Sequence, residues 1–265
     1  MTTTTRRNLT IRHTQLSALP DSVWGESTLE VLNVSNNKLA YLPDDIRKLQ
    51  QLRWLDVGHN ALTKLPETLG ELDGLVDYLY VHDNSLTAIP QSIGKLTKLR
   101  YLNLSENQIS KLPESIGELR GLIELRAGDN RMLSLPQSIG KLVLLRELHA
   151  PRNDFMELPE SIGALTKLKK LNLEENKLTR LPESIGGLES LFELNLRGNK
   201  VRDFPASFAK LARLAYLDLR ANGMTALPSS IAGLPLEKLD LRWNPIAEYP
   251  VWLEQLEQRG CTVFR

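Results

Sequence analysis

Cysteine is almost absent from the chain, with Cys261 the only one among 265 residues. A single cysteine excludes an internal disulfide framework and most cysteine-based metal sites. No stretch reaches eighteen consecutive apolar residues, and the first residues, MTTTTRRNLTIRHTQL, contain no apolar run of signal-peptide length. We therefore expect a soluble, cytoplasmic protein with no membrane partner.

An excess of charge of either sign is also missing. Lysine and arginine total 33, aspartate and glutamate total 32, and the formal net charge is +1. Dedicated nucleic-acid-binding domains normally carry a basic excess, so we expect no nucleic-acid partner. Aromatic residues make up only 6% of the chain, so any local concentration of them is informative.

Proline, in contrast, recurs with a fixed period. Eleven of the 14 prolines lie 23 residues apart, except for one spacing of 24 and one of 22. They are Pro20, Pro43, Pro66, Pro90, Pro113, Pro136, Pro159, Pro182, Pro205, Pro228 and Pro250. Six residues before each of them stands an asparagine, from Asn37 to Asn244, with Thr14 in the first case. A fixed period of this length indicates a repeat protein.

Each repeat combines two different hydrophobic patterns. The unit reads LxxLxLxxNxLxxLPxxIGxLxx, as in Leu99 to Gly121. The LxL segment alternates apolar and polar residues, which predicts a half-buried strand. The LPxxIG segment cannot continue the sheet, because proline lacks an N–H and glycine weakens a strand, so we expect a short helical or 3-10 return. The asparagine amide is expected to bond the backbone of the neighbouring turn.

One such unit buries too little apolar surface to fold alone, whereas a stack of eleven buries a continuous column of leucines. This pattern resembles the leucine-rich repeat family. The LPxxIGxLxxL variety is similar to intracellular repeats of Ras-pathway scaffolds, the Scribble class and bacterial stand-alone proteins. The resemblance implies an α/β solenoid, a curved arc with a parallel β-sheet on its concave face and short helical or 3-10 returns on its convex face. We assign residues 1–5 to a disordered tail, 6–258 to eleven repeats in a single domain, and 259–265 to a capping strand.

The resemblance also implies a function. Members of this class are mostly binding platforms, so we expect a non-catalytic protein–protein interaction module that binds a protein or peptide on its concave face, without a cofactor and as a monomer. Two alternatives stay open. One is a secreted bacterial effector that uses the same face, and the other is a purely structural or designed repeat scaffold.

Several repeats depart from the pattern. Leu75 is interpreted as an extra residue, which predicts a small bulge before the fourth strand. Alanine replaces the second strand leucine at Ala127 and Ala150, and we expect Met132 and Phe155 to refill that space.

The two ends of the repeat array call for caps, because exposed ends of a solenoid need covering. We expect Trp24 to cover the N-terminal end of the core. At the other end Trp252, Leu253 and Leu256 predict a closing amphipathic turn, followed by a last strand, and Cys261 is expected to be a buried cap thiol.

Side chains that flank the strand leucines define the candidate surface, since strand residues alternate between faces. Trp54, Tyr78 and Tyr101 occupy one column on three successive strands, with Tyr80 and His82 beside them. Rigid amphipathic rings are typical of protein-binding hot spots. The alternative is cross-strand stacking that only stabilises the sheet.

A second feature of this surface is a column of three arginines, Arg197, Arg220 and Arg242, with Asp218 and Asp240 one column away. This column is either a ladder for a carboxylate- or phosphate-bearing partner or a set of charges that the aspartates neutralise. Both interpretations stay open. Arg126 and His149, on strands between the two features, complete the predicted ligand-binding set.

Four apolar residues, Leu133, Val143, Leu144 and Met156, stand at positions that are usually polar in this unit. They mark either a second contact surface or side chains that pack around the two alanine-bearing strands, and we favour packing.

Catalytic and metal-binding patterns are weak. His59 and His82 fall on adjacent repeats near Asp83, but no conventional ligand spacing is present, so we predict no metal site. His149 has no obvious serine or cysteine partner on its face, and no phosphate-binding glycine motif occurs. We therefore predict that the chain is not an enzyme.

Overall fold

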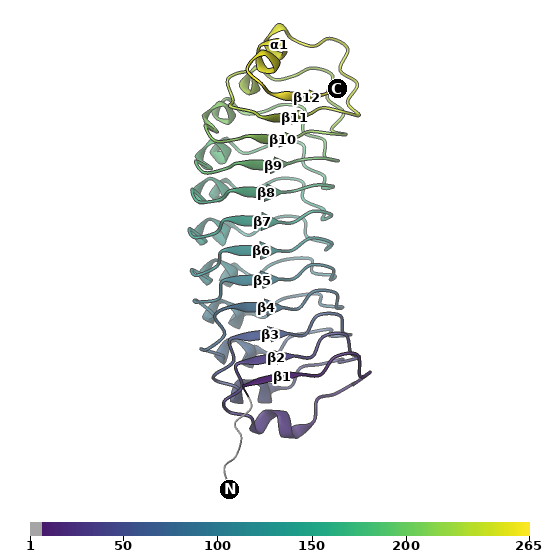
Figure 1. Cartoon of the computed structure of the whole chain (residues 1–265), viewed down its shortest axis with the longest axis vertical. Coiled ribbons are helices and arrows are strands. Elements are labelled where there is room, and N and C mark those ends of the chain that lie inside the picture. Colours follow the sequence, from purple (N-terminus) through teal and green to yellow (C-terminus); the bar gives the residue numbers. More distant parts are fainter. Residues whose placement is uncertain (1–6) are drawn as a thin grey trace. The chain divides into compact units, whose positions relative to one another are not determined.

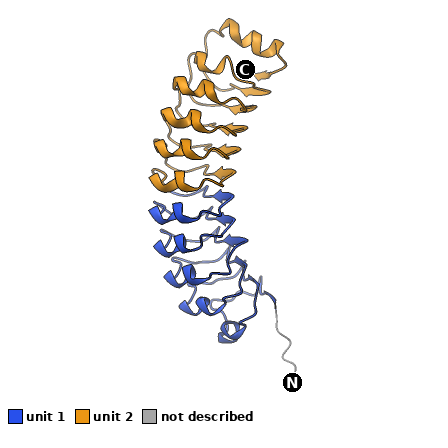
Figure 2. Ribbon diagram, turned by 90° about the vertical axis from the view of Figure 1, so that its left-hand side faces the viewer, with its two compact units in different colours: residues 1–131 blue, residues 132–265 orange. Residues whose placement is uncertain are grey.

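The computed structural model describes residues 7–265 (Figure 1). The chain divides into two compact units, residues 1–131 and residues 132–265 (Figure 2). The tail predicted for residues 1–5 lies outside the described residues.

Short strands alternate with 3-10 helices along the described chain. The strands are β1 (Asn8–Thr10), β2 (Val31–Asn33), β3 (Trp54–Asp56), β4 (Tyr78–Tyr80), β5 (Tyr101–Asn103), β6 (Glu124–Arg126), β7 (Glu147–His149), β8 (Lys170–Asn172), β9 (Glu193–Asn195), β10 (Tyr216–Asp218), β11 (Lys238–Asp240) and β12 (Thr262–Phe264). The 3-10 helices are η1 (Asp21–Gly25), η2 (Asp44–Lys48), η3 (Glu67–Glu71), η4 (Gln91–Lys95), η5 (Glu114–Glu118), η6 (Gln137–Lys141), η7 (Glu160–Ala164), η8 (Glu183–Gly187), η9 (Ala206–Lys210) and η10 (Ser229–Ile231). One α-helix, α1 (Val251–Gln258), precedes β12.

Within each unit the strands pair in parallel and follow the order of the sequence. Strands β1 to β6 pair in this way in the first unit, and β7 to β12 in the second. Equivalent positions of successive repeats are partners, so Trp54 lies opposite Tyr78, and Tyr78 opposite Tyr101. The predicted solenoid of parallel strands and 3-10 returns is confirmed, and columns in the sequence become columns on the sheet.

The core consists of the leucine at the centre of each strand and the apolar residues of the returns. Leu79 and Leu102 are fully buried, as are Ile93 and Leu99. Pro90 has an extended backbone and begins η4, where the Ile93 N–H donates to the Pro90 carbonyl and the Leu96 N–H donates to the Ile93 carbonyl. These two consecutive turns reverse the chain in few residues, which is how the LPxxIG segment acts as a return.

The recurring asparagine bonds two repeats at once, as predicted. In the buried Asn107, Nδ2 donates to the carbonyls of Leu104 in its own repeat and Val81 in the preceding one, both at 3.1 Å. Its Oδ1 accepts the Leu86 N–H at 2.9 Å. Asn60, Asn84, Asn130, Asn176, Asn199, Asn222 and Asn244 bond the carbonyls of their own and the preceding repeat in the same way.

The residue immediately before this asparagine, or before Thr14, adopts a left-handed backbone in every repeat. This left-handed column consists of His13, Asn36, His59, Asp83, Glu106, Asp129, Arg152, Glu175, Gly198, Ala221 and Trp243, with φ between 48° and 68°. Only one member is glycine, the residue for which this conformation carries no steric penalty.

The bulge before β4 is confirmed, but the extra residue is not Leu75. Leu75 is buried, and its N–H donates to the Leu72 carbonyl in the same turn that other repeats form at this position. The insertion lies within Val76–Asp77 instead. The Arg100 N–H donates to the Val76 carbonyl, one residue earlier than the repeat would place it.

The irregular repeats pack as predicted, and apolar side chains are buried at both ends of the array. Ala127, Ala150, Met132 and Phe155 are all fully buried, and Trp24 is also buried. At the C-terminal end, α1 buries two leucines, Leu253 and Leu256. Strand β12 pairs with β11.

The thiol of Cys261 is buried as predicted, and burial raises its pKa.

Candidate functional site

The side chains that flank the buried leucine of each strand, and the one that follows the next buried apolar residue, form what we call the strand face of each unit. The sequence-predicted site residues all lie on it. In the first unit they are Trp54, Tyr78, Tyr80, His82, Tyr101 and Arg126, and in the second they are His149, Arg197, Arg220 and Arg242.

Four rings of the first unit make one continuous group, the aromatic cluster: Trp54, Tyr78, Tyr80 and Tyr101. Ring centroids are 5.9 Å apart for Trp54 and Tyr78, and 5.5 Å apart for Tyr78 and Tyr101. Tyr80 stacks on Tyr78 at 5.8 Å and tilts against Tyr101 at 4.9 Å. Tyr78 is 43% exposed and the other three are half-buried, so none of the rings belongs to the leucine core.

Partial burial raises the pKa of two phenols of this cluster. It raises the pKa of Tyr101 to about 12, and burial followed by the neighbouring Tyr78 raises the pKa of Tyr80. The Arg126 guanidinium carbon lies 6.0 Å from the centre of the Tyr101 ring, and Arg126 Nε donates to Glu124 Oε1 at 2.7 Å. The raised pKa values favour the neutral form of Tyr80 and Tyr101, and an arginine lies beside the Tyr101 ring.

A shallow pocket opens beside the cluster. It has a volume of about 240 Å³ and is lined by Asp77, Tyr78, Arg100, Tyr101, Ile123 and Glu124. Pockets that enclose drug-sized ligands are typically larger, about 300–1,000 Å³. Its size suits one or two side chains of a partner rather than a complete small-molecule ligand.

Next to Tyr80, two histidines of adjacent repeats meet. Their Nε2 atoms, on His59 and His82, are 3.2 Å apart. Nδ1 of His59 lies 2.5 Å from Asp83 Oδ2. The His82 ring packs over Gly58, where an added Cβ would lie 2.4 Å from the ring. Burial, and then His59, lower the pKa of His82.

The second unit carries the arginine column, and its charges are neutralised locally. Arg220 lies 2.5 Å from Asp218 and 3.5 Å from Asp240, and Arg242 lies 2.6 Å from Asp240. Burial alone would raise the pKa of Asp240, but hydrogen bonds from Arg242 and the charges of both arginines outweigh it and lower the pKa. This pairing supports the second of the two interpretations left open by the sequence.

A tryptophan that the sequence did not single out lies beside these arginines. Trp243 is 63% exposed, and the guanidinium carbons of Arg197, Arg220 and Arg242 lie 5.4, 5.6 and 5.8 Å from its ring centre. It belongs to the left-handed column, one position beyond the three strand columns that define the candidate surface. The sequence signal that could have identified it is a tryptophan directly after an arginine of the column, at a position that is polar in most other repeats.

The remaining predicted residue of the second unit, His149, belongs to a polar group on β7 and β8. Its Nε2 lies 3.0 Å from Glu147 Oε2, and Lys170 lies 3.4 Å from the same carboxylate. Burial would raise the pKa of Glu147, but His149 and Lys170 outweigh it and lower the pKa.

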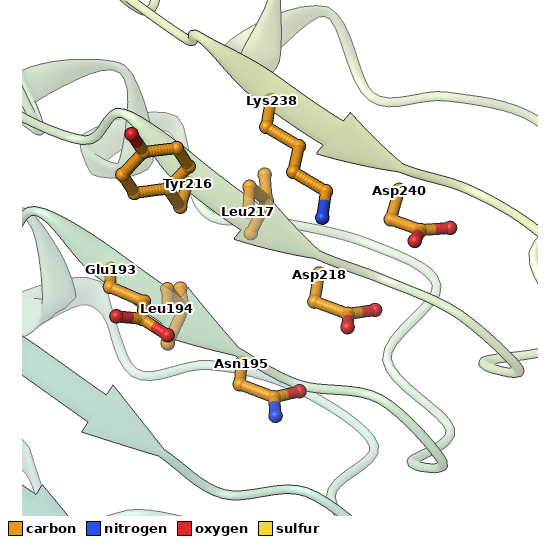
Figure 3. A pocket seen from close by; sticks show the side chains of 8 residues that line it. All are labelled: Glu193, Leu194, Asn195, Tyr216, Leu217, Asp218, Lys238 and Asp240. Atoms are coloured by element: carbon orange, nitrogen blue, oxygen red, sulfur yellow. The ribbon is translucent and has the colours of Figure 1, made fainter. Parts of the chain in front are cut away.

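A pocket of about 250 Å³ lies further along this unit (Figure 3). It is lined by Glu193, Leu194, Asn195, Tyr216, Leu217, Asp218, Lys238 and Asp240. In Figure 3 the Lys238 amino group points toward the side of the pocket that carries Asp218. Its polar lining and small volume again suit a side chain of a partner.

The apolar residues at normally polar positions do not pack around the alanine-bearing strands, so that expectation was wrong. Leu133 and Met156 are 62% and 61% exposed, and Val143 and Leu144 are exposed as well. We refer to these four residues as the second apolar group.

Comparison with solved structures supports the fold. A leucine-rich repeat protein of Leptospira interrogans is 25% identical, with a TM-score of 0.56 over 97% of this chain and 83% of that one. The plant peptide hormone receptor RGFR1, in complex with RGF2, is 28% identical, with a TM-score of 0.75 over 97% of this chain and 47% of that one. This chain therefore spans less than half of that receptor chain.

The leucine-rich repeat domain of the type III effector XopL is 26% identical, with a TM-score of 0.61 over 68% of this chain and 73% of that one. A sequence search of curated proteins returned no significant match.

No helix among residues 7–265 is long and apolar enough to cross a bilayer.

Sequence profiles of known families identify the repeats directly. The profile described as "Leucine-rich repeat region" matches residues 85–176 and 158–242, which is more than half of the chain. A second profile, "Leucine rich repeat", matches residues 7–62. The periodic leucines, the asparagine ladder and the parallel strands agree with these matches, and the chain belongs to the leucine-rich repeat family.

Proposed function

We propose that this chain is a non-catalytic binding module that holds a peptide or an extended protein segment on its strand face, with the aromatic cluster as its main anchor. Leucine-rich repeat domains are generally protein-binding modules and typically non-catalytic. The observation that carries the proposal is the gathering of four rings on the solvent side of β3, β4 and β5, in a chain that is only 6% aromatic.

Stacking between the rings of the cluster is compatible with a binding role. The rings contact one another, and each cross-strand pair contributes up to about 1 kcal/mol to the stability of the sheet. Leucines in the core already hold these strands together, so stability does not require four large rings at the surface. The same contacts fix the rings before a partner arrives, which reduces the entropy lost on binding. A preorganised group of tyrosine and tryptophan is the composition typical of hot spots.

The chemistry of the surface favours a mixed polar and apolar peptide. Neutral phenols offer hydrogen bonds and ring faces, and Arg126 and Glu124 add one charge of each sign beside the Tyr101 ring. The shallow pocket at Tyr78 and Tyr101 accommodates one or two side chains. The solved RGFR1 receptor, whose partner is the peptide RGF2, supports a peptide ligand for this chain.

Peptide display provides the test. We would select binders from a random peptide library on the wild-type protein and measure their affinities for Trp54→Ala/Tyr101→Ala. Truncation of two hot-spot rings is expected to weaken binding at least tenfold, or about 1.4 kcal/mol. The matched control is Leu133→Ala/Met156→Ala, which removes exposed apolar side chains of the second apolar group. Binders that lose affinity only for this control would contradict the proposal.

Trp243 is proposed as a second anchor, in place of the arginines beside it. Those arginines are occupied by Glu174, Asp218 and Asp240, whereas the ring of Trp243 is exposed. A peptide that binds the strand face of the second unit is expected to lose affinity for Trp243→Ala.

The proposal extends to the repeat class, the compartment, the oligomeric state and the bounds of the repeats. We infer that the chain belongs to the 23-residue intracellular class, acts in the cytoplasm as a monomer, and carries eleven repeats in residues 6–258 with a capping strand in residues 259–265. The LPxxIGxLxxL pattern supports the class. Equilibrium sedimentation of the purified chain tests the oligomeric state.

A secreted effector is the second candidate function, and the likeness to the XopL effector domain favours it. An effector of this kind would use the same strand face inside a host cell. A reporter fused to the C-terminus of the chain, assayed for transfer into host cells with and without a functional secretion system, distinguishes this candidate from a protein retained in the cytoplasm.

A further inference from the structure

Two histidines of adjacent repeats meet beside the aromatic cluster. His59 and His82 are 23 residues apart in the sequence, and the repeat brings their imidazoles together from adjacent loops. The ring centroids are 4.7 Å apart in an edge-to-face arrangement, and the two Nε2 atoms are 3.2 Å apart.

This separation is the one that two nitrogen ligands of a tetrahedral metal ion adopt. With Zn–N bonds of about 2.0–2.1 Å and tetrahedral angles, two ligating nitrogens lie about 3.3 Å apart. Imidazole nitrogen is a preferred ligand of Zn²⁺ and of the neighbouring divalent transition metals. The two side chains therefore need little movement to bind one ion.

Asp83 completes the arrangement that metal-binding histidines usually have. Its Oδ2 lies 2.5 Å from Nδ1 of His59, so that Nδ1 carries a proton, and in the neutral imidazole Nε2 keeps its lone pair. A carboxylate behind a ligating histidine fixes the tautomer and the ring orientation and raises the basicity of the ligand. His82 is positioned differently, because its ring is held against Gly58.

With both imidazoles neutral and the His59 proton on Nδ1, the two nitrogens form a hydrogen bond donated by His82 Nε2 to His59 Nε2. We propose that a divalent transition metal ion, with Zn²⁺ as the representative, takes the place of the proton in this hydrogen bond and is bound by Nε2 of His59 and Nε2 of His82, with Asp83 as a positioning residue. The His82 proton moves to Nδ1 of the same ring by tautomerisation. The remaining coordination positions are filled by water.

Carboxylates and burial act in opposite directions on His82. The carboxylates of Asp56, Asp83 and Glu106 each favour positive charge there, but burial of the ring, followed by His59, outweighs them and lowers the pKa of His82. Metal binding requires the neutral imidazole.

This inference goes beyond the proposed function and does not depend on it. The test uses the full-length chain after removal of any histidine tag, with ZnCl₂ as the probe in calorimetry and CoCl₂ as a spectroscopic probe. We expect one Zn²⁺ per chain and the visible absorption of Co²⁺ with nitrogen ligands. The variant His59→Gln/His82→Gln is expected to lose this binding, and Asp83→Asn is expected to weaken it by about 10–100-fold.

The chain has only two further histidines, His13 and His149, and they supply the controls. His13 is a matched one, because it occupies the same left-handed column as His59. Binding is expected to be unchanged in His13→Gln and in His149→Gln. The proposal is overturned if wild-type protein fails to bind Zn²⁺, if the double variant binds as tightly as wild type, or if either control loses binding. Circular dichroism of each variant establishes that it is folded.

Discussion

At the scale of single residues, the asparagine of each repeat replaces backbone hydrogen bonds that the turn cannot make for itself. Asn107 is nearly inaccessible to solvent, and its amide satisfies two carbonyls and one N–H that are buried with it. Unlike a leucine, this side chain cannot be exchanged for an apolar one of similar size, because the backbone groups around it would remain unpaired.

Replacement of Asn107 by alanine is therefore expected to reduce the free energy of unfolding by about 2–4 kcal/mol, the loss expected when several buried polar groups are left without partners. Urea denaturation followed by circular dichroism measures it. The control is Gln108→Ala at the exposed neighbouring position, expected to change the free energy by less than about 0.5 kcal/mol. Equal effects of the two substitutions would contradict the ladder as a source of stability.

Asp240 is the residue whose ionisation couples most directly to folding on the strand face of the second unit. Its pKa is lower in the folded protein than the ordinary value of about 3.9. The ionised carboxylate therefore contributes stability that is present above pH 4 and is lost as the pH falls through the folded pKa. The stability difference between wild type and Asp240→Asn should be largest near pH 7 and should shrink below pH 4.

Urea denaturation at pH 7, 5 and 3 measures this difference. Asp203→Asn, at an exposed position, serves as the control and is expected to change the free energy of unfolding at pH 7 by less than about 0.5 kcal/mol. A constant difference for Asp240→Asn would contradict the ion-pair interpretation of the arginine column.

At the scale of elements, the 3-10 returns stack more closely than side chains would allow. A Cβ added to Gly163 in η7 would lie 2.2 Å from the carbonyl oxygen of Ser184 in η8. Equivalent contacts recur at Gly70, Gly94, Gly140 and Gly186. The glycine of the LPxxIG motif is thus required by the approach of the next return, and its backbone angle is not the reason.

Gly163→Ala is expected to destabilise the protein by about 1–3 kcal/mol, because backbone atoms of the next repeat must move to admit the methyl group. Gly233→Ala is the matched control, since an added Cβ there meets no atom within 4 Å. Thermal denaturation of both variants measures the difference. A tolerated Gly163→Ala would mean that adjacent returns are free to move apart.

The elements were largely predictable, because each half of the repeat has its own period. Strand centres, 3-10 returns and the asparagine ladder follow from apolar spacing and from the chemistry of proline and asparagine. The position of the bulge was not predictable from Leu75 alone. When a repeat gains one residue, the sequence does not show which neighbouring residue occupies the buried position before the strand. In the structure Leu75 occupies it.

At the scale of the whole molecule, the repeat makes the neighbours of a residue predictable but not the contacts between their side chains. Register alone predicts that Trp54, Tyr78 and Tyr101 are adjacent, and they are. The meeting of His59 and His82 depends on the space above Gly58, and the three arginines around Trp243 depend on the conformations of long side chains. These contacts are set by local packing, which no periodicity encodes.

The left-handed column has a practical consequence for protein engineering. Its eleven positions already carry histidine, asparagine, aspartate, glutamate, arginine, glycine, alanine and tryptophan on nearly the same backbone. Each non-glycine member occupies a conformation that glycine would adopt without strain, yet the turn forms with all of them. The column is therefore a row of grafting points, one per repeat, at which new chemical groups can be installed while the leucine interior stays as it is.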